Sequence, residues 1–363
     1  MGANYTNGFD VDKVTNALFS RIGWMAQVSS PVLNPTNALS KSGRFFNDGS
    51  FHTLVSLNTV KSIMEQLNAS DIEFNAFIST TQKAVILRCL NGIFSDQEYI
   101  SQSLLYNRSG YSNNDQPLPN LGKFVGIQIK LPSAINLATQ IDSISLYFDS
   151  VATFNIYVFN DTIATPVFTI PVTTVANTQT IIDIPNCILN YVGAANHGGI
   201  FYIGYFQDDL GLTKAIWETN VDFVDANPYR ALPITAIKTG TTSFNTKFIS
   251  YQITTAGINP HFSVFRDHTW QIINKPSLFD NVIGLQMAAQ IIELLLFSQR
   301  QNATERGLKS DADKMQASLE LTGVAPISDG PRTTGLRKQI QIELNRLQKS
   351  FYPKPKSAIV NEC

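Results

Sequence analysis

The sequence predicts an α+β protein in which an antiparallel β-sandwich of jelly-roll type is inserted into a discontinuous helical domain. Apolar residues recur at helical spacing in the first third of the chain, alternate at every second position in the middle, and return to helical spacing toward the C-terminus. Turn-rich segments separate the alternating stretches and no long helical pattern interrupts them, which favours a sandwich over a parallel α/β sheet. We therefore expect a helical domain made of residues 1–120 and 257–363, with the sandwich at residues 121–256.

The first half of the helical domain is expected to be helical after an irregular opening. Residues 50–67 carry apolar side chains at mostly helical spacing. Two capping boxes of the form S-x-x-E follow, beginning at Ser70 and Ser95. The first predicts a core helix, and the second predicts a shorter helix that ends near Tyr106. Residues 107–120 are rich in Asn, Gly, Ser and Pro, which predicts a loop where the insertion begins.

The middle of the chain carries the strand pattern. The stretches FVGIQIKL and IDSISLYF alternate between apolar residues and small or polar ones. Further strands are predicted at FNIYVF, VFTIPV, TIIDI, GGIFYIGYF, LTKAIW and KFISYQI.

The stretch Gly198–Gly211 (GGIFYIGYFQDDLG) could be read as a ligand site in which carboxylates lie beside aromatic rings. Both faces of the run are apolar, however, which is typical of a central strand buried on both sides. Asp208 and Asp209 come where the strand ends, and aspartate followed by glycine is ordinary turn chemistry. A patterned set of oxygen ligands such as an EF-hand loop is lacking. The sequence therefore favours a buried strand that runs into a turn.

The second half of the helical domain begins with two more predicted strands, HFSVF and HTWQII. A strong apolar stripe then predicts a helix over residues 277–297. Another helix is expected over residues 303–321, and the loop GVAPISDGPRTTG ends it. A last amphipathic helix is expected over residues 336–351.

Composition limits the classes of function. Charged residues make up only 15% of the chain and the net charge is −1, which argues against a nucleic-acid binder dominated by phosphate contacts. A surface with few charges suits a protein that its neighbours cover, because burying an unpaired ion costs more than burying a paired amide. The N-terminus has no signal-peptide pattern, and the most apolar run, residues 287–297, is too short to span a membrane.

The cysteines and histidines form no recognisable site. Cys89, Cys187 and Cys363 have no spacing that predicts a disulfide framework or a zinc site, which fits folding in a reducing cytoplasm. The four histidines, His52, His197, His261 and His268, stand in no ligand-spaced motif. Around His261 and His268, in HFSVFRDHTW, a polar network that anchors a turn is favoured over a catalytic pair.

Known catalytic fingerprints are also lacking. The chain has no nucleophile elbow, P-loop or dinucleotide fingerprint, so we expect no enzyme activity, no cofactor and no metal. The acidic cluster Glu218, Asp222 and Asp225 is explained by a solvated loop, although a pair of carboxylates that meet only in the fold stays open.

Two residue sets could bind a partner. Trp217, Tyr229 and Trp270 could stack on sugars, as aromatic residues do in lectin-like sandwiches, although a core or interface role is more common. Basic residues gather near the C-terminus, and the candidates for partner or nucleic-acid contact are Arg332, Arg337, Lys338, Arg346 and Lys349. A solvated helix face is the favoured interpretation of this set, and contact with nucleic acid or an acidic partner is the alternative.

Three stretches carry a resemblance to a known family. They are the opening MGANYTNGFDVDKVTNALFSRIGW with the following PVLNPTNALSKSGRFFNDGSFHTLVSL, the strand GIFYIGYFQDDLG, and the segment FRDHTWQIINKPSLFDNVIGLQMAAQIIELLLFSQRQNATERGLK. In overall character these resemble virion structural proteins of crAss-like tailed bacteriophages that infect Bacteroides, in particular the ring components of the neck or tail.

The resemblance implies a non-enzymatic subunit that is made in the host cytoplasm and assembled into the virion. It implies a homo-oligomeric ring at or below the portal, with the portal or neighbouring tail rings as partners, possible DNA contact in the lumen, and no membrane. Rings arise from heterologous contacts whose rotation closes. The alternative function is a carbohydrate-binding β-sandwich adhesin on a phage particle. A polysaccharide hydrolase is disfavoured because no catalytic constellation stands out.

Overall fold

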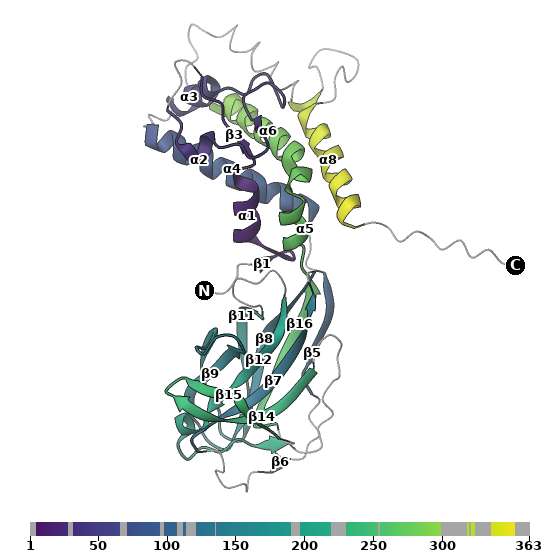
Figure 1. Ribbon diagram of the computed structural model, residues 1–363. Helices are drawn as coiled ribbons and strands as arrows, with labels where there is room; N and C mark the ends of the chain where they lie inside the picture. The colour runs from purple at the N-terminus through teal and green to yellow at the C-terminus, as the bar shows by residue number, and fades with distance from the viewer. Residues whose placement is uncertain are drawn as a thin grey trace, which may run out of the picture. The chain divides into compact units, whose positions relative to one another are not determined.

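The chain forms a β unit and a helical unit (Figure 1). The computed structural model describes residues 5–27, 32–65, 71–94, 98–106, 112–113, 121–134, 136–189, 197–218, 230–252, 255–298, 318, 321–323 and 335–352. The β unit comprises Met1–Asp10 and Gln97–Trp270, and the helical unit comprises Val11–Asp96 and Gln271–Cys363. The α+β class with an antiparallel sandwich is confirmed.

The β unit is a two-sheet sandwich in which all neighbouring strands of the two large sheets are antiparallel. The six-stranded sheet has the order β10 (Phe168–Thr173), β9 (Thr153–Asn160), β12 (His197–Phe206), β7 (Lys123–Ala134), β14 (Arg230–Gly240) and β15 (Ser243–Tyr251). The four-stranded sheet has the order β11 (Thr178–Ile188), β8 (Leu137–Phe148), β16 (Ile258–Arg266) and β5 (Tyr99–Leu104).

This strand order is that of a jelly roll with one added hairpin. Along the chain, β5, β8, β11 and β16 enter one sheet while β7, β9, β10 and β12 enter the other, so that two Greek keys interleave. The hairpin β14–β15 extends the second sheet by pairing with the otherwise free edge of β7. Small pairs accompany the sandwich: β1 (Tyr5–Thr6) with β2 (Phe9–Asp10), and β6 (Ser112–Asn113) with β13 (Trp217–Glu218).

The main core lies between the two sheets, and strand β12 shows how it is built. Phe201, Ile203 and Tyr205 point into this core together with alternate residues of the facing sheet. Tyr202 and Phe206 point the opposite way, into a second apolar cluster. The prediction that this strand is central and buried on both faces is confirmed, because β12 lies between β9 and β7.

The second cluster exists because the added hairpin covers the outer face of its own sheet. Phe244 of β15 stacks on Phe124 of β7 at a ring-centroid distance of 4.3 Å and makes edge contacts with Phe159 and Tyr202. The paired glycine Gly204 leaves room for these rings, since a Cβ there would meet the Phe124 ring at 2.7 Å as well as the β7 backbone. Both faces of the six-stranded sheet are therefore covered by apolar side chains and excluded from solvent in this region.

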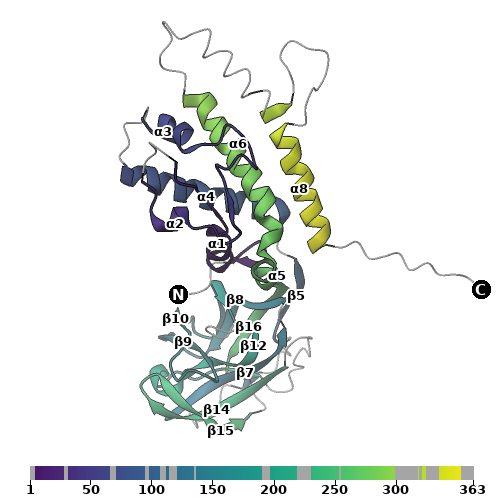
Figure 2. The same cartoon turned by 45° about the horizontal axis from the view of Figure 1, so that its top comes forward.

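The helical unit packs around one central helix, α6 (Asp280–Ser298) (Figure 2). Its neighbours are α3 (Leu57–Glu65), α4 (Asp71–Ile93) and α8 (Leu336–Phe351). Shorter elements are α1 (Val11–Phe19), α2 (Pro35–Ala38), α5 (Thr269–Asn274), the 3₁₀ turns η1 (Gln207–Leu210, in the β unit) and η2 (Pro276–Phe279), and the parallel pair β3 (Ile22–Gly23) and β4 (Arg44–Phe45).

Glycines allow the closest helix contacts. A Cβ on Gly284 of α6 would overlap the ring of Phe51, so this ring lies directly on the helix backbone. A Cβ on Gly92 of α4 would meet the side chain of Leu344 of α8 at 3.2 Å. Because every other residue type has a Cβ, these two glycines set how near the neighbouring side chains approach.

A bidentate ion pair ties the start of α6 to the loop after α1. Arg21 Nε and Nη2 donate to the two carboxylate oxygens of Asp280 at 2.6 and 2.7 Å. The hydrogen bonds that Arg21 donates to Asp280 raise the pKa of Arg21, against the opposing effect of burial. Asp280 is in the first turn of α6, where a negative charge also interacts favourably with the helix dipole.

The segment Pro276–Leu296 is long and apolar enough to cross a membrane by length and composition. This differs from the expectation that the apolar run was too short, because the helix begins earlier than that run. Within the helical unit 61% of its most apolar window is buried, as expected for the core helix of a globular unit.

Two predicted elements near the boundaries were wrong. The helix expected to end near Tyr106 is instead strand β5, which pairs with β16 and forms an edge of the sandwich. The segment HTWQII, expected to be a strand, forms helix α5. The sandwich accordingly includes strands on both sides of the expected range 121–256: β5 before it and β16 after it.

Other predictions were right in part or fall outside the described residues. Of the helix expected over 50–67, residues 50–56 are not helical, Leu57–Glu65 is helical, and residues 66 and 67 lie outside the described residues. Of LTKAIW only the final tryptophan enters a strand. The helices expected over 277–297 and 336–351 correspond to α6 and α8. Both capping serines, most of the loop 107–120 and most of the helix 303–321 lie outside the described residues.

Candidate functional site

The two aspartates that follow β12 belong to a turn. They lie in η1, where Asp208 accepts hydrogen bonds from the Gly122 backbone N–H at 2.7 Å and from Lys238 Nζ at 3.3 Å. The hydrogen bond from Gly122 is the main cause that lowers the pKa of Asp208. Burial raises the pKa of the neighbouring Asp209. The carboxylate of Asp208 therefore fastens the hairpin and the start of β7 to the turn.

A polar cluster lies on the four-stranded sheet and contains serine, histidine and aspartate. His261 Nδ1 is 3.1 Å from Asp142 Oδ2, and Ser263 Oγ donates to the same carboxylate oxygen. Gln140 donates to the other carboxylate oxygen, and Gln102 donates to Ser263 Oγ at 3.0 Å. In a hydrolase the serine would donate to the imidazole, which then accepts its proton. Here the serine is fully buried and donates to the carboxylate, so the arrangement is a structural network.

His268 belongs to a different network at the bend between β16 and α5. Its backbone N–H donates to the Gly8 carbonyl at 2.8 Å, and the preceding Asp267 accepts from the Thr269 N–H at 2.9 Å. The Asp10 N–H donates to Thr269 Oγ1 at 2.8 Å. These bonds agree with the interpretation that the polar residues near His268 anchor a turn. They also satisfy polar groups at Thr269, the first residue of α5, and so favour the start of the helix there.

The buried cysteines are poor nucleophiles. Burial raises the pKa of Cys89 and of Cys187 to about 12, so both thiols are neutral near pH 7. Among the described residues, no group of three or more histidine, cysteine, aspartate or glutamate side chains could hold a metal ion.

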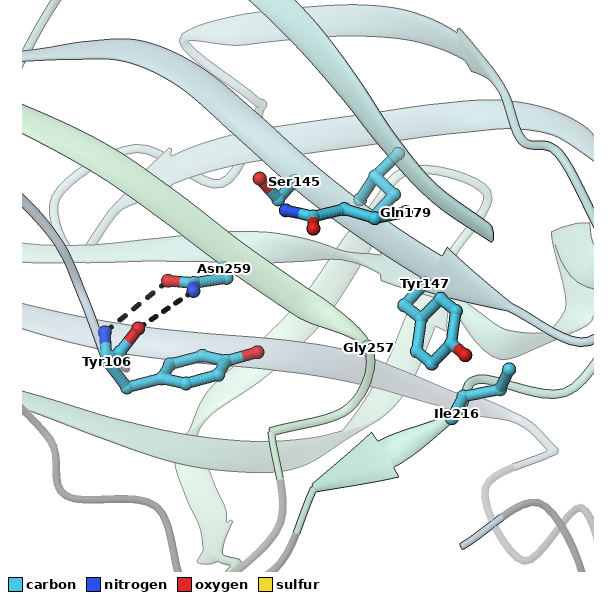
Figure 3. Close-up of a pocket in the computed structure, with 8 residues that line it drawn as sticks. Tyr106, Ser145, Tyr147, Gln179, Ile216, Gly257 and Asn259 are labelled. Atoms are coloured by element: carbon cyan, nitrogen blue, oxygen red, sulfur yellow. Dashed lines mark hydrogen bonds between the residues drawn. The ribbon is translucent and has the colours of Figure 1, made fainter. Parts of the chain in front are cut away.

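A shallow hollow opens beside the end of β8 (Figure 3). Ser145, Tyr147 and Gln179 line it, and Asn259 clamps the Tyr106 backbone by donating to the carbonyl at 3.0 Å and accepting from the N–H at 3.4 Å. The enclosed space holds about one water molecule, which is far less than a sugar ring needs.

The aromatic residues proposed for sugar stacking do not form a described row. Trp270 is partly buried in helix α5, and Tyr229 lies outside the described residues. Trp217 lies in the short strand β13, next to Glu218. Of the acidic cluster, Asp222 and Asp225 also lie outside the described residues.

The basic candidates near the C-terminus divide into two kinds on α8. Arg337 Nη2 donates to Glu293 of α6 at 2.9 Å, and Arg346 Nε donates to Glu343 at 2.8 Å. Lys338 and Lys349 are exposed, and neither side chain has a hydrogen-bond or ion-pair partner among the described residues. Arg332 lies outside the described residues. The sequence alone had not distinguished the compensated arginines from the lysines.

Exposed apolar side chains lie at several places on the β unit. On the outermost strands they are Tyr99, Ile100 and Leu104 of β5, Ile181 of β11, and Phe248 and Tyr251 of β15; the others are Leu232 and Ile237 of β14 and Leu121, Val151, Val175 and Leu212 in connecting segments. Phe248 of β15 is 68% exposed. The Val175 N–H donates to Thr180 Oγ1 at 2.9 Å, which places Val175 beside the start of β11 and near Ile181. Sequence reasoning missed these residues, because an alternating strand pattern does not show which strands are outermost.

Comparison of the chain with protein-family models, curated proteins and solved structures gives no significant match.

Proposed function

We propose that this chain is a non-enzymatic structural subunit of a phage virion, a ring-forming component of the neck or tail. The observation that carries the proposal is that the outermost strands β5, β11 and β15 of the sandwich all bear exposed apolar side chains. Outermost strands present unpaired backbone groups, and proteins that stay monomeric usually shield them with charges, prolines or covering elements. Strand β15, SFNTKFISY, has a single charge and no proline. Such an edge suits a surface that a neighbouring subunit covers.

The polar chemistry of the described residues supports the same proposal. In the serine–histidine–aspartate cluster the buried Ser263 donates to Asp142, while His261 and Asp142 are half-buried. The two described cysteines are neutral thiols, and the hollow beside β8 holds about one water molecule. The jelly roll itself occurs in viral capsid proteins as well as in lectins and cupins, so the fold alone does not assign function.

The alternative function, a carbohydrate-binding adhesin, needs a row of exposed aromatic residues flanked by polar groups. The water-sized hollow and the partly buried Trp270 give it less support than the apolar edges give to assembly. A glycan array with the purified chain tests this alternative directly.

The assembly proposal is tested with purified recombinant chain and with virions. We expect native mass measurements to give multiples of 40.1 kDa, and negative-stain images to show closed rings. Antibodies against the chain are expected to label the neck or tail of particles of the phage that encodes it. Particles that lack the chain would overturn the proposal, whatever the recombinant protein does alone.

A further inference from the structure

We propose that the outer face of α8 is a contact surface for the phosphate backbone of duplex DNA. The surface consists of Lys338, Gln341, Asn345 and Lys349, and we call it the lysine face. The inference rests on the proposed function, because a ring at the neck or tail encloses the path of the genome. It deepens that function by naming the partner and the residues that meet it.

Helix geometry places the two lysines on one line that points away from the helical unit. With 3.6 residues per turn, Lys338, Asn345 and Lys349 lie within about 40° of one another around the helix axis. The buried residues of α8, Leu336, Ile340 and Leu347, lie on the opposite side and face α4 and α6. The lysines are therefore directed to solvent by the same packing that holds α8 in place.

The structure shows two groups of basic residues on α8: arginines that have a carboxylate partner, and lysines that have none among the described residues. Arg337 and Arg346 are each held by a carboxylate, at 2.9 and 2.8 Å, so their charges are largely compensated. Lys338 and Lys349 have no such partner among the described residues, and both are exposed. In a chain whose net charge is −1, this face presents two lysines that have no partner among the described residues, and no acidic residue of α8 lies between them on the same line. A polyanion is the partner that complements such a face.

The spacing of the lysines favours duplex DNA. Eleven residues of α-helix span about 16 Å. The major groove of B-DNA is about 12 Å wide, so a helix lying across it can bring one lysine to each flanking phosphate strand. Between the lysines lie Gln341 and Asn345, whose side chains hydrogen-bond to each other at 2.9 Å and are neutral, and the exposed apolar side chain of Ile342. Lysine contacts with phosphate carry no sequence information, which suits a protein past which any genome segment must move.

The test is binding of a fluorescein-labelled 30-bp duplex of arbitrary sequence to the full chain, followed by fluorescence anisotropy from 25 to 200 mM KCl. Each lysine–phosphate contact contributes about 0.9 to the slope of log K against log salt. We therefore expect Lys338→Ala/Lys349→Ala to lower that slope by about 1.8 per bound chain. The matched control is Lys41→Ala/Lys275→Ala, which removes two exposed lysines that lie outside α8 and changes the net charge equally. The control is expected to bind as the wild type does.

Three outcomes would overturn the proposal. One is that the wild type fails to bind the duplex at 25 mM KCl, and another is that both double variants lose affinity equally, as general charge attraction would require. The third is tighter binding to poly-glutamate than to DNA at equal ionic strength, which would assign the lysine face to an acidic protein partner. Native mass of the same samples reports assembly separately, so rings that form without binding DNA would leave the proposed function standing.

Discussion

The hairpin β14–β15 is held to the sandwich by Phe244, and replacing this residue tests that account of the fold. Phe244 is 8% exposed and contacts the rings of Phe124, Phe159 and Tyr202 at centroid distances of 4.3, 5.0 and 5.3 Å. Truncating a buried phenylalanine to alanine costs about 3–5 kcal/mol. Each favourable ring pair contributes about 0.5–1.5 kcal/mol beyond area burial, so the upper part of that range applies. We expect Phe244→Ala to destabilise the hairpin by about 4–5 kcal/mol.

Hydrogen exchange measured by mass spectrometry gives the opening free energy of β14 and β15, and urea unfolding followed by circular dichroism gives the effect on the whole chain. The matched control is Phe248→Ala on the same strand, where the ring is 68% exposed. Surface substitutions usually change stability by no more than about 0.5 kcal/mol, and the control should stay within that limit. Equal effects of the two variants, or a loss below about 1 kcal/mol for Phe244→Ala, would refute the reasoning.

Three further predictions concern packing and protonation. Gly284→Ala should destabilise the helical unit by about 1–3 kcal/mol in thermal unfolding, because the added methyl group overlaps the ring of Phe51. In a Phe51→Ala background the same change should stabilise the unit, because alanine favours helix over glycine. A loss of stability in both backgrounds would contradict this account. In a Cys363→Ser background, Cys89 should react with a thiol reagent at pH 8 only when the chain is unfolded. Because burial raises the pKa of Cys89 and of Cys187 from 9.0 to about 12, the contribution of the two thiols to stability should be constant below pH 9 and decline as the pH rises from 9 toward 12. A flat urea midpoint between pH 9 and 12 would count against buried thiols. Asp208 has a lowered pKa, so its contribution to stability is present above its unfolded value of about 3.9 and lost as the pH falls through the folded value. The protection of the hairpin amides against hydrogen exchange, corrected for the intrinsic rate at each pH, should fall on acidification in the wild type and change less in Asp208→Asn.

The jelly roll and the helical unit each carry one of the two proposed contact surfaces. In the β unit, the surface that bears on the proposed assembly consists of apolar residues on the outermost strands. In the helical unit, the surface that bears on the proposed DNA contact is the lysine face of α8. The two surfaces have different chemistry, and salt distinguishes them, because phosphate contacts weaken steeply with ionic strength whereas apolar burial does not.

Local sequence determined those elements in which one periodicity dominates. Strand β12 could be predicted as central because both of its faces are apolar, and only a strand with neighbours on both sides and cover on both faces buries them all. Helices α6 and α8 could be predicted from stripes at helical spacing, since packing an apolar stripe is what stabilises most helices in proteins. The two aspartates after β12 followed from turn chemistry in the same way.

The tertiary structure decided what short and ambiguous segments become. The segment Tyr99–Leu104 follows a capping-box pattern yet is a strand, because β16 offers an open edge and backbone pairing there outweighs the local helix signal. HTWQII has β-branched and aromatic residues yet is helical, and Asp267 bonds the first-turn amide of Thr269 at its start. Whether a given arginine is compensated, or a given phenylalanine is buried, depends on residues far away in the chain. Arg337 meets Glu293, and Phe244 meets Phe124. Sequence periodicity carries no record of such partners, so the candidate surfaces emerged only from the fold.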